Sequence, residues 1–386
     1  MSNYILVSAF TNINFQNTRT QEIMNRLRGS CLAITTDFDH SKKDYYSKEE
    51  MGNPQQIHIH VPRYSKNLSI KRLFSHIVFS KKLYRYLNNL EEKPKAIYCT
   101  MPSSSSAFVC AKYCKKNHVK FIIDVIDLWP DSLLPFVKGK MFVKGFLFPW
   151  TYLARYAYKN ADVILGESKK YAEEAKLYNK KAEIYPLYLG VDMNIIRDIK
   201  YNNPVKLEKP SDEVWIAYAG SLGVSYGFDT LLNAIKLIHN KYEYKLWFIG
   251  DGVDRKNIES FINVNKLNAE ITGFLPYHKL LGYLMYCDIG INMFRPGTKV
   301  VYSYKFNDYV ATDCYILNSL EGETAEMIDD YRIGTNFNYS DNPLYIAIDN
   351  VLSKWDQYSK WKNNNELLIK EKLDKAIIYS VIPEVF

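Results

Sequence analysis

Short apolar runs that end in a turn and lead into a helical pattern recur along the chain, and this alternation constrains the fold most. In the first half, the apolar run Tyr4–Ala9 is followed by a polar loop, a helical pattern at Gln21–Leu27 and a second apolar run at Leu32–Thr35. In the second half, Trp215–Ala219 leads through a glycine-rich turn into a helical pattern at Phe228–His239. Strands that alternate with helices are typical of doubly wound α/β domains, which bind ligands at the carboxyl ends of their strands.

The 386 residues are enough for two domains of this kind. We expect the first domain to cover residues 1–192, with Ala161–Gly166 as its last strand, and the second to cover residues 193–365. Residues 184–192 would connect the two, followed by a polar linker at 195–212. Residues 366–386 are predicted to form a C-terminal helix and tail that returns to the first domain.

Charge is distributed unevenly between the two halves. Residues 1–192 contain 29 Lys and Arg against 17 Asp and Glu, a net charge of +12, whereas the remainder contains 21 against 25, a net charge of −4. A basic half joined to a slightly acidic one predicts that the basic half faces a polyanion or an anionic membrane surface.

Two segments of the basic half, residues 63–90 and 132–160, combine Lys and Arg with aromatic residues and contain no acid. In the first, Ile70, Phe74 and Ile77 recur at helical spacing. Both segments have the composition of helices that lie on an anionic lipid surface. The first could instead pack on its own sheet or cover nucleic acid, and the second could be buried against the second domain. Since no nucleic-acid recognition motif is present, we favour the membrane surface and expect no nucleic-acid partner.

Other sequence features concern location and metals. No run of 18 apolar residues is present, and the N-terminus enters a strand without a signal-peptide pattern. The six cysteines are scattered without zinc-ligand spacing, and His58 and His60 alternate along a strand with no acidic or Cys partner nearby. We therefore expect a cytoplasmic protein with reduced thiols and no metal, peripheral on the inner face of the cell membrane.

The turns that follow the strands carry the candidate binding residues. The turn after Trp215–Ala219 is rich in glycine, and glycines between a strand and a helix allow backbone N–H groups to approach a phosphate. Further along, cations, an acid and a second glycine turn follow one another, as a sugar-nucleotide site requires, although an ordinary loop–helix–strand–helix unit with solvated charges also fits. In the first half, Asp127 lies at a strand end, and Arg19 either points to the ligand crevice or is a solvated helix-start residue. The candidates in the second half are Gly220, Ser221, Gly223, Arg295, Lys299, Lys305, Asp308, Glu321, Gly322, Glu323 and Glu326.

Five motifs in order resemble the C-terminal domain of GT-B glycosyltransferases of family 4. They are Ala-Gly-Ser-Leu-Gly (219–223), Phe-Ile-Gly-Asp-Gly (248–252), Ile-Thr-Gly-Phe-Leu-Pro (271–276), Cys-Asp-Ile-Gly-Ile-Asn (287–292) and the stretch 297–326. Asp-Val-Ile-Asp-Leu-Trp-Pro (124–130) and residues 185–192 are similar to the N-terminal domain and hinge of that family. The nearest subgroup comprises bacterial capsule, O-antigen and other surface-polysaccharide transferases.

This resemblance implies two Rossmann-like domains that face a central cleft. It implies a retaining, metal-independent glycosyltransferase that needs no cofactor and moves a sugar from a UDP-, GDP- or dTDP-sugar to an acceptor, often a polyprenyl-diphosphate-linked glycan. By position, Gly220, Ser221 and Gly223 would form the turn under the diphosphate, and Arg295, Lys299 and Lys305 would neutralise it. Asp308 would bind ribose, and Asp127 would stand on the acceptor side. The turn near the sugar would consist of Glu321, Gly322 and Glu323, and Glu326 would cap or line the following helix.

Several positions depart from the family pattern. Ser221 and Tyr226 stand where many relatives have an Arg and a Lys, Val300 replaces the first glutamate of the E-x7-E motif, and Ile126 replaces a His. We therefore expect Lys305 to supply the missing positive charge. Two alternatives stay open at this point: a soluble transferase that acts on a small molecule or protein, and a non-catalytic protein that binds nucleotide sugars.

Overall fold

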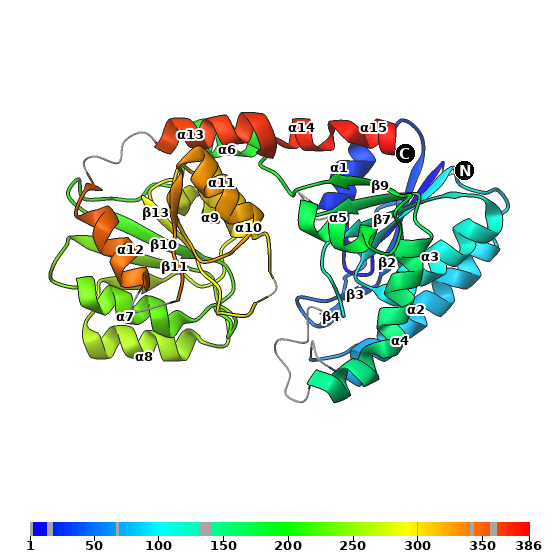
Figure 1. The fold of residues 1–386 in the computed structure, drawn as a ribbon, viewed down its shortest axis with the longest axis horizontal. Helices are drawn as coiled ribbons and strands as arrows, with labels where there is room; N and C mark the ends of the chain where they lie inside the picture. The colour runs from blue at the N-terminus through cyan, green and yellow to red at the C-terminus, as the bar shows by residue number, and fades with distance from the viewer. Residues whose placement is uncertain are drawn as a thin grey trace. The chain divides into compact units, whose positions relative to one another are not determined.

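The computed structural model describes residues 3–13, 18–66, 69–130, 140–298, 300–339, 343–355 and 361–386, except for the side chains of 140–144. The chain forms two compact units (Figure 1): unit 1 comprises Met1–Tyr188 and Ile378–Phe386, and unit 2 comprises Leu189–Ile377. The boundary between the two units, at Tyr188–Leu189, thus lies slightly before the predicted boundary at 192–193. Residues 366–377, which the sequence assigns to a separate tail, are part of unit 2.

Unit 1 is built on seven parallel strands in the order β5-β2-β1-β6-β7-β8-β9. The central strands β6 and β7 are buried almost throughout, as expected for a parallel sheet that is covered on both faces. The prediction that Ala161–Gly166 contains the last strand is wrong, because residues 183–186 add β9 beside β8. The strands are β1 (Tyr4–Val7), β2 (Cys31–Thr36), β5 (Gln56–Ile59), β6 (Ala96–Met101), β7 (Lys120–Val125), β8 (Val163–Gly166) and β9 (Glu183–Pro186).

Hydroxyl side chains start four helices of unit 1. Thr18, Ser69, Ser103 and Ser168 each accept a hydrogen bond from a backbone N–H in the first turn of the helix that follows, which satisfies a donor that the helix itself leaves free. Helix α3 packs against both α2 and α4. The helices are α1 (Arg19–Arg26), α2 (Ile70–Asn88), α3 (Ser104–Asn117), α4 (Lys140–Lys159) and α5 (Lys169–Lys176).

Two further segments complete unit 1. Residues 37–56 are polar in composition and contain the hairpin β3 (Phe38–Asp39) and β4 (Asp44–Tyr45), in which the rings of Phe38 and Tyr46 are buried. The C-terminal turns Tyr379–Val381 and α15 (Ile382–Val385) pack on α1. Tyr379 is fully buried there because it belongs to the hydrophobic core of unit 1.

Unit 2 has six parallel strands in the order β12-β11-β10-β13-β14-β15. They are β10 (Val214–Ala219), β11 (Tyr244–Ile249), β12 (Ala269–Ile271), β13 (Ile289–Asn292), β14 (Tyr315–Asn318) and β15 (Gly334–Asn336). The helices are α6 (Met193–Tyr201), α7 (Phe228–Ile238), α8 (Arg255–Asn265), α9 (Tyr277–Leu284), α10 (Tyr304–Ala311), α11 (Glu323–Tyr331), α12 (Pro343–Leu352), α13 (Trp361–Leu368) and α14 (Lys375–Ile378). Part of the predicted linker 195–212 is helical, because Ile196 and Ile199 of α6 are buried and α6 packs on α9.

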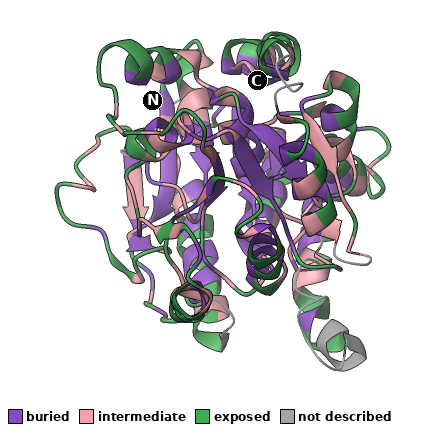
Figure 2. Cartoon of the chain, turned by 90° about the vertical axis from the view of Figure 1, so that its left-hand side faces the viewer, coloured by how far each residue is buried: buried purple, intermediate pink, exposed green. Residues whose placement is uncertain are grey.

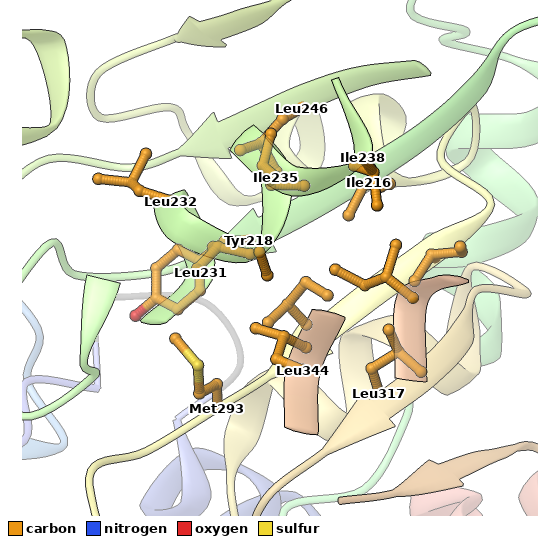
Figure 3. Close-up of a cluster of buried hydrophobic side chains, with 14 of the residues drawn as sticks. Ile216, Tyr218, Leu231, Leu232, Ile235, Ile238, Leu246, Met293, Leu317 and Leu344 are labelled. Carbon is orange, nitrogen blue, oxygen red and sulfur yellow. The ribbon is translucent and has the colours of Figure 1, made fainter. Parts of the chain in front are cut away.

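The apolar face of α7 forms one side of the core of unit 2. Leu231, Ile235 and Ile238 recur at three- and four-residue spacing and lie with Ile216 and Leu246 of the sheet in one buried cluster (Figure 3). Figure 2 shows the result at the level of the fold: buried strands are flanked by helices whose outer faces are exposed. The spacing of apolar residues therefore fixes which face of α7 meets the sheet.

Among the described residues, no helix is both long enough and apolar enough to cross a membrane. All six cysteines are buried as free thiols.

Candidate functional site

Two glycine turns meet at the carboxyl edge of the unit 2 sheet. The backbone N–H of Gly220 donates to the carbonyl oxygen of Ile249 at 2.9 Å, so the turns after β10 and β11 lie against each other. A β-carbon on Gly250 would lie 1.9 Å from the carbonyl oxygen of Gly220, and both glycines have positive φ. Only glycine allows this approach without a backbone shift. The two turns therefore form one surface beside the predicted phosphate-binding residues.

Lys305 lies at this surface. It occupies the first turn of α10, is only 8% exposed, and its Nζ lies 3.8 Å from the position of a β-carbon on Gly220. No hydrogen-bond partner of this Nζ is found among the described residues. A buried amine without a partner is costly, and burial lowers the pKa of Lys305 well below its ordinary value. A bound anion would remove that cost.

Three aromatic rings surround the Lys305 amine, and the sequence predicts none of these contacts, although Tyr226 stands where many relatives of the resembled family have a Lys. Its Nζ lies 4.0 Å from the ring centre of Tyr218, 4.1 Å from that of Tyr226 and 5.1 Å from that of Phe294. Ring faces attract a cation, so they favour the charged amine against the effect of burial. In sequence these aromatics look like ordinary core residues, because each lies in or beside a strand or turn of its own.

Asp308, one helical turn after Lys305, accepts a hydrogen bond from the Tyr277 hydroxyl at 2.8 Å. Burial raises the pKa of Asp308 to about 6, while Tyr277 and Lys305 act to lower it. Lys305 and Asp308 are three residues apart in α10, so the cation and the acid are neighbours on one side of the helix. Tyr277 is a further member of the site that the sequence does not indicate.

The other predicted cations differ in how far the structure describes them. Arg295 is exposed and forms an ion pair with Asp229 at 3.4 Å. Its backbone N–H donates to the carbonyl oxygen of Ser225, and its Cγ lies 3.2 Å from the position of a β-carbon on Gly227. Arg295 therefore lies against the far end of the glycine-rich turn. Lys299 is outside the described residues.

The turn residues after β10 are held by a buried ring. The Tyr218 hydroxyl donates to the carbonyl oxygen of Ser221 at 2.9 Å, while the Ser221 side chain is exposed. Gly223 accepts a backbone hydrogen bond from Tyr226 at 3.3 Å. The same two tyrosines thus contact both the turn and Lys305, so that the turn and the amine are positioned together.

A further glycine turn, at Glu321–Glu323, precedes and starts α11. Gly322 has φ 81° and precedes the helix, and no atom of the described residues lies within 4 Å of the position of a β-carbon there. Glu323 is partly buried in the first turn, whereas Glu321 and Glu326 are exposed. A helix start with an open glycine gives a ligand room to approach the backbone. Val300, where the family pattern has a glutamate, is partly exposed.

Three asparagines that the sequence does not single out link the carboxyl ends of β13, β14 and β15. Asn292 donates to the side-chain oxygen of Asn318 at 2.8 Å, and Asn318 donates to that of Asn336 at 2.7 Å. Asn292 and Asn318 are fully buried. These hydrogen bonds fix the edge from which the loop to Arg295 and the turn at Glu321 start.

In unit 1, Asp127 follows β7 as predicted, and its charge raises the pKa of Arg72, although burial lowers that pKa more. The sequence allows two roles for Arg19, a residue that points to the ligand crevice or a solvated helix-start residue, and the structure shows neither. Its guanidinium is 7% exposed and forms two hydrogen bonds with the carboxylate of Asp124, and Tyr98 donates to the same carboxylate. Arg19 is therefore part of the buried structure of unit 1.

No group of three His, Cys, Asp or Glu side chains that could hold a metal ion is found in the described part of the chain. His58 and His60 lie in or beside β5, and their Nδ1 atoms contact the carbonyl oxygen of Thr36 at 3.2 Å and the carboxylate of Asp37 at 2.6 Å.

No protein-family model matches the sequence. Protein CapJ of Staphylococcus aureus is 27% identical to this chain over 192 residues, which are 49% of the chain and 45% of CapJ. The match therefore spans less than half the length of that protein.

Solved structures match over nearly the whole chain. Sucrose-phosphate synthase from Thermosynechococcus elongatus has a TM-score of 0.74 at 15% identity, with 99% of this chain and 97% of that chain covered. HepE of Anabaena in complex with UDP has a TM-score of 0.69 at 12% identity, with 99% and 98% covered. WaaG, a glycosyltransferase involved in lipopolysaccharide biosynthesis, has a TM-score of 0.64 at 11% identity, with 99% of each chain covered. The predicted GT-B fold is confirmed by this likeness.

Proposed function

We propose that this protein is a retaining glycosyltransferase that moves a sugar from a nucleotide-diphosphate sugar to a lipid-linked glycan acceptor in bacterial surface-polysaccharide biosynthesis. The observation that carries the proposal is the buried Lys305 amine, which lies 3.8 Å from the β-carbon position of Gly220 in the glycine turn. A fold alone does not define an activity, whereas a buried amine beside a glycine turn is a specific binding feature.

Positive charge at a glycine turn suits a leaving diphosphate. When the bond to the sugar breaks, negative charge develops on the diphosphate, and a preorganised cation stabilises that charge most where water is excluded. Lys305 provides such a cation within its three aromatic rings, and the turn at Gly220 leaves the backbone open beside it. Arg295 adds a second, exposed cation, so that the protein's own residues can do the work of a metal ion.

Other residues at the carboxyl edge of the unit 2 sheet can contact the ribose and the sugar of the donor. Asp308 can accept hydrogen bonds from ribose hydroxyls in addition to that from Tyr277. The helix start at Gly322 and Glu323 can contact the sugar. HepE, one of the structural neighbours, is known in complexes with UDP and UDP-glucose, which supports a nucleotide sugar as the donor.

A lipid-linked acceptor is supported by the surface of unit 1. On α2, the side chains of Ile70, Phe74 and Ile77 are 76%, 55% and 36% exposed, and on α4 Phe146 and Phe148 are 57% and 64% exposed. The apolar row of α2 therefore does not pack on its own sheet. Exposed apolar rings among lysines and arginines suit a peripheral contact with an anionic membrane.

The test is a panel of UDP-, GDP- and dTDP-sugars, with donor hydrolysis as the readout and NMR to determine the anomeric configuration of the product. We expect one donor to be consumed and the configuration of its anomeric carbon to be retained. Consumption of a donor with transfer only to a soluble sugar would favour an enzyme on small molecules, of which the neighbour sucrose-phosphate synthase is an example by name. Binding of a donor without any reaction would favour a non-catalytic protein that binds nucleotide sugars.

A further inference from the structure

A group of basic residues that the donor site does not use lies at the carboxyl edge of the unit 1 sheet. This basic cluster consists of His40, Lys43, Arg72 and His76. Arg72 and His76 come from the first two turns of α2, His40 and Lys43 come from the β3–β4 hairpin, and the ring of Phe10 contacts His40, Arg72 and His76. The charge of Asp127, which the family resemblance places on the acceptor side, acts to raise the pKa of Arg72.

Ring and side-chain contacts hold the basic cluster together. The ring centre of Phe10 lies 5.1 Å from that of His40 and 5.3 Å from that of His76, and the Arg72 guanidinium lies 5.4 Å from it. His40 Nδ1 lies 2.6 Å from the Tyr64 hydroxyl and 3.4 Å from Lys43 Nζ. Three residues far apart in sequence, His40, Arg72 and His76, thus lie around the ring of Phe10.

His76 is the unusual member of the basic cluster. Its side chain is 3% exposed, and neither ring nitrogen has a hydrogen-bond partner among the described residues. Its backbone carbonyl oxygen, in contrast, accepts hydrogen bonds from Ser80 and Ser105 at 2.8 and 3.3 Å. Buried polar atoms are normally satisfied, so two unpaired nitrogens beside two cations indicate a site for a ligand with hydrogen-bonding oxygens.

The local charge favours an anion. Burial and the charges of Arg72 and Lys43 lower the pKa of His40 to about 4, and burial with Arg72 and His40 lowers that of His76 to about 3. Two acids face this region: Asp39 accepts hydrogen bonds from the backbone N–H groups of Ser41 and Lys42, and Asp127 interacts with Arg72. The N–H groups at the start of α2 add positive potential, and no acid in the first turn compensates it.

We propose that the basic cluster binds the diphosphate group of the lipid-linked acceptor, an inference that rests on the proposed function. Lys43 and Arg72 supply charge, and one ring N–H of each of His40 and His76 donates a hydrogen bond to a phosphate oxygen. A metal ion is disfavoured because two permanent cations lie among the histidines. The exposed row of Ile70, Phe74 and Ile77 lies on the opposite face of these two turns of α2 from Arg72 and His76, so an attached prenyl chain would reach it by passing around the start of the helix, where Ile70 is 76% exposed.

The test measures binding of geranyl diphosphate, inorganic pyrophosphate and geraniol to the full chain by calorimetry. We expect both diphosphates to bind, geranyl diphosphate more tightly, and geraniol not to bind measurably. Arg72→Gln and Lys43→Gln should each weaken diphosphate binding about tenfold or more, because each removes a charge-assisted hydrogen bond. Lys81→Gln, which removes an exposed charge on the same helix, is the matched control and should bind as the wild type does.

A second readout does not depend on the variants folding well. In histidine-ring NMR spectra of the wild type, pyrophosphate should move the titrations of His40 and His76 to higher pH. Diphosphate binding that is unchanged in Arg72→Gln and Lys43→Gln, or that is lost in Lys305→Ala instead, would overturn the proposal, as would unmoved histidine titrations. Binding of UDP, measured in parallel, depends on unit 2, so its failure alone would refute the proposed donor and leave the basic cluster standing.

Discussion

The side-chain amine of Lys305 lies 3.8 Å from the place where a β-carbon would stand on Gly220. A side chain at position 220 would therefore contact the amine, and the glycine keeps the space beside it free. The two residues belong to elements that are far apart in sequence, the turn after β10 and the first turn of α10. Their proximity turns a glycine-rich turn, which is a weak signal by itself, into a site with positive charge.

Gly250 is expected to be essential for the stability of this edge. Because a β-carbon there would lie 1.9 Å from the Gly220 carbonyl oxygen, Gly250→Ala forces the two turns apart. We expect a loss of about 2 kcal/mol or more in the free energy of unfolding, measured by urea denaturation. Gly145→Ala is the control: its β-carbon meets no atom within 4 Å, and the helix there should gain up to about 1 kcal/mol. Equal stability of the two variants would contradict the described packing.

Asp308 should make unit 2 less stable as pH rises. Since the pKa of Asp308 is raised to about 6, the native state holds a proton that the unfolded chain has already released, so stability from this group falls as pH rises from about 4 through about 6. In Asp308→Asn this loss of stability should be absent, so the unfolding free energies at about pH 4 and above about pH 6 should differ less than in the wild type. Tyr277→Phe removes a hydrogen bond that lowers the pKa, so the Asp308 titration should move to higher pH in carboxyl NMR spectra. A titration that stays in place would show that the hydrogen bond has no such effect.

The Arg19–Asp124 pair should be essential for unit 1. Both side chains are buried, so Arg19→Met leaves the Asp124 carboxylate without its charged partner, and we expect a loss of about 3–5 kcal/mol in unfolding free energy. Lys370→Met breaks an ion pair with Glu366 in which both side chains are exposed, and it should cost much less than the buried pair because solvent screens the charges. Chemical denaturation compares the two, and a similar cost for both would refute a structural role of the buried pair.

Anionic vesicles test the membrane surface of unit 1. Phe74→Ser combined with Phe148→Ser removes two exposed rings, each contributing about 1.5–3 kcal/mol when buried, so vesicle binding in a flotation assay should fall at least tenfold. Phe274 of unit 2 is 83% exposed and provides the control, because Phe274→Ser should float as the wild type does. If the double variant and the control bind equally, α2 and α4 do not form the membrane contact.

The alternation of strands and helices could be predicted from the sequence because it depends on local apolar spacing. The run Trp215–Ala219, its glycine turn and the helix at Phe228 are where that spacing places them. Short elements with mixed composition were not predictable in this way: β9 looks like a connector, and residues 195–201 of α6 look like part of a linker. Only packing on β8 and α9 makes them regular.

The surroundings of the site residues depend on contacts between distant segments. The sequence indicates Lys305 and Asp308, but not that Tyr218, Tyr226 and Phe294 converge on the amine, because single aromatics in apolar runs look like core residues. The same limit applies to Arg19, whose partner Asp124 is 105 positions away. A charged residue at a helix start looks the same in sequence whether it faces solvent or a buried carboxylate.

The measurement that tests the central claim most directly is the turnover of Lys305→Ala with the sugar nucleotide that the wild type consumes. Lys305→Met serves as a second variant, because an apolar side chain in place of a buried amine without a hydrogen-bond partner should leave the stability unchanged or raise it. We predict that both variants stay folded and lose turnover about 10²- to 10³-fold, as expected when a preorganised charge is removed from a developing diphosphate. Turnover equal to that of the wild type would contradict the assignment of Lys305 and, with it, the proposed donor site.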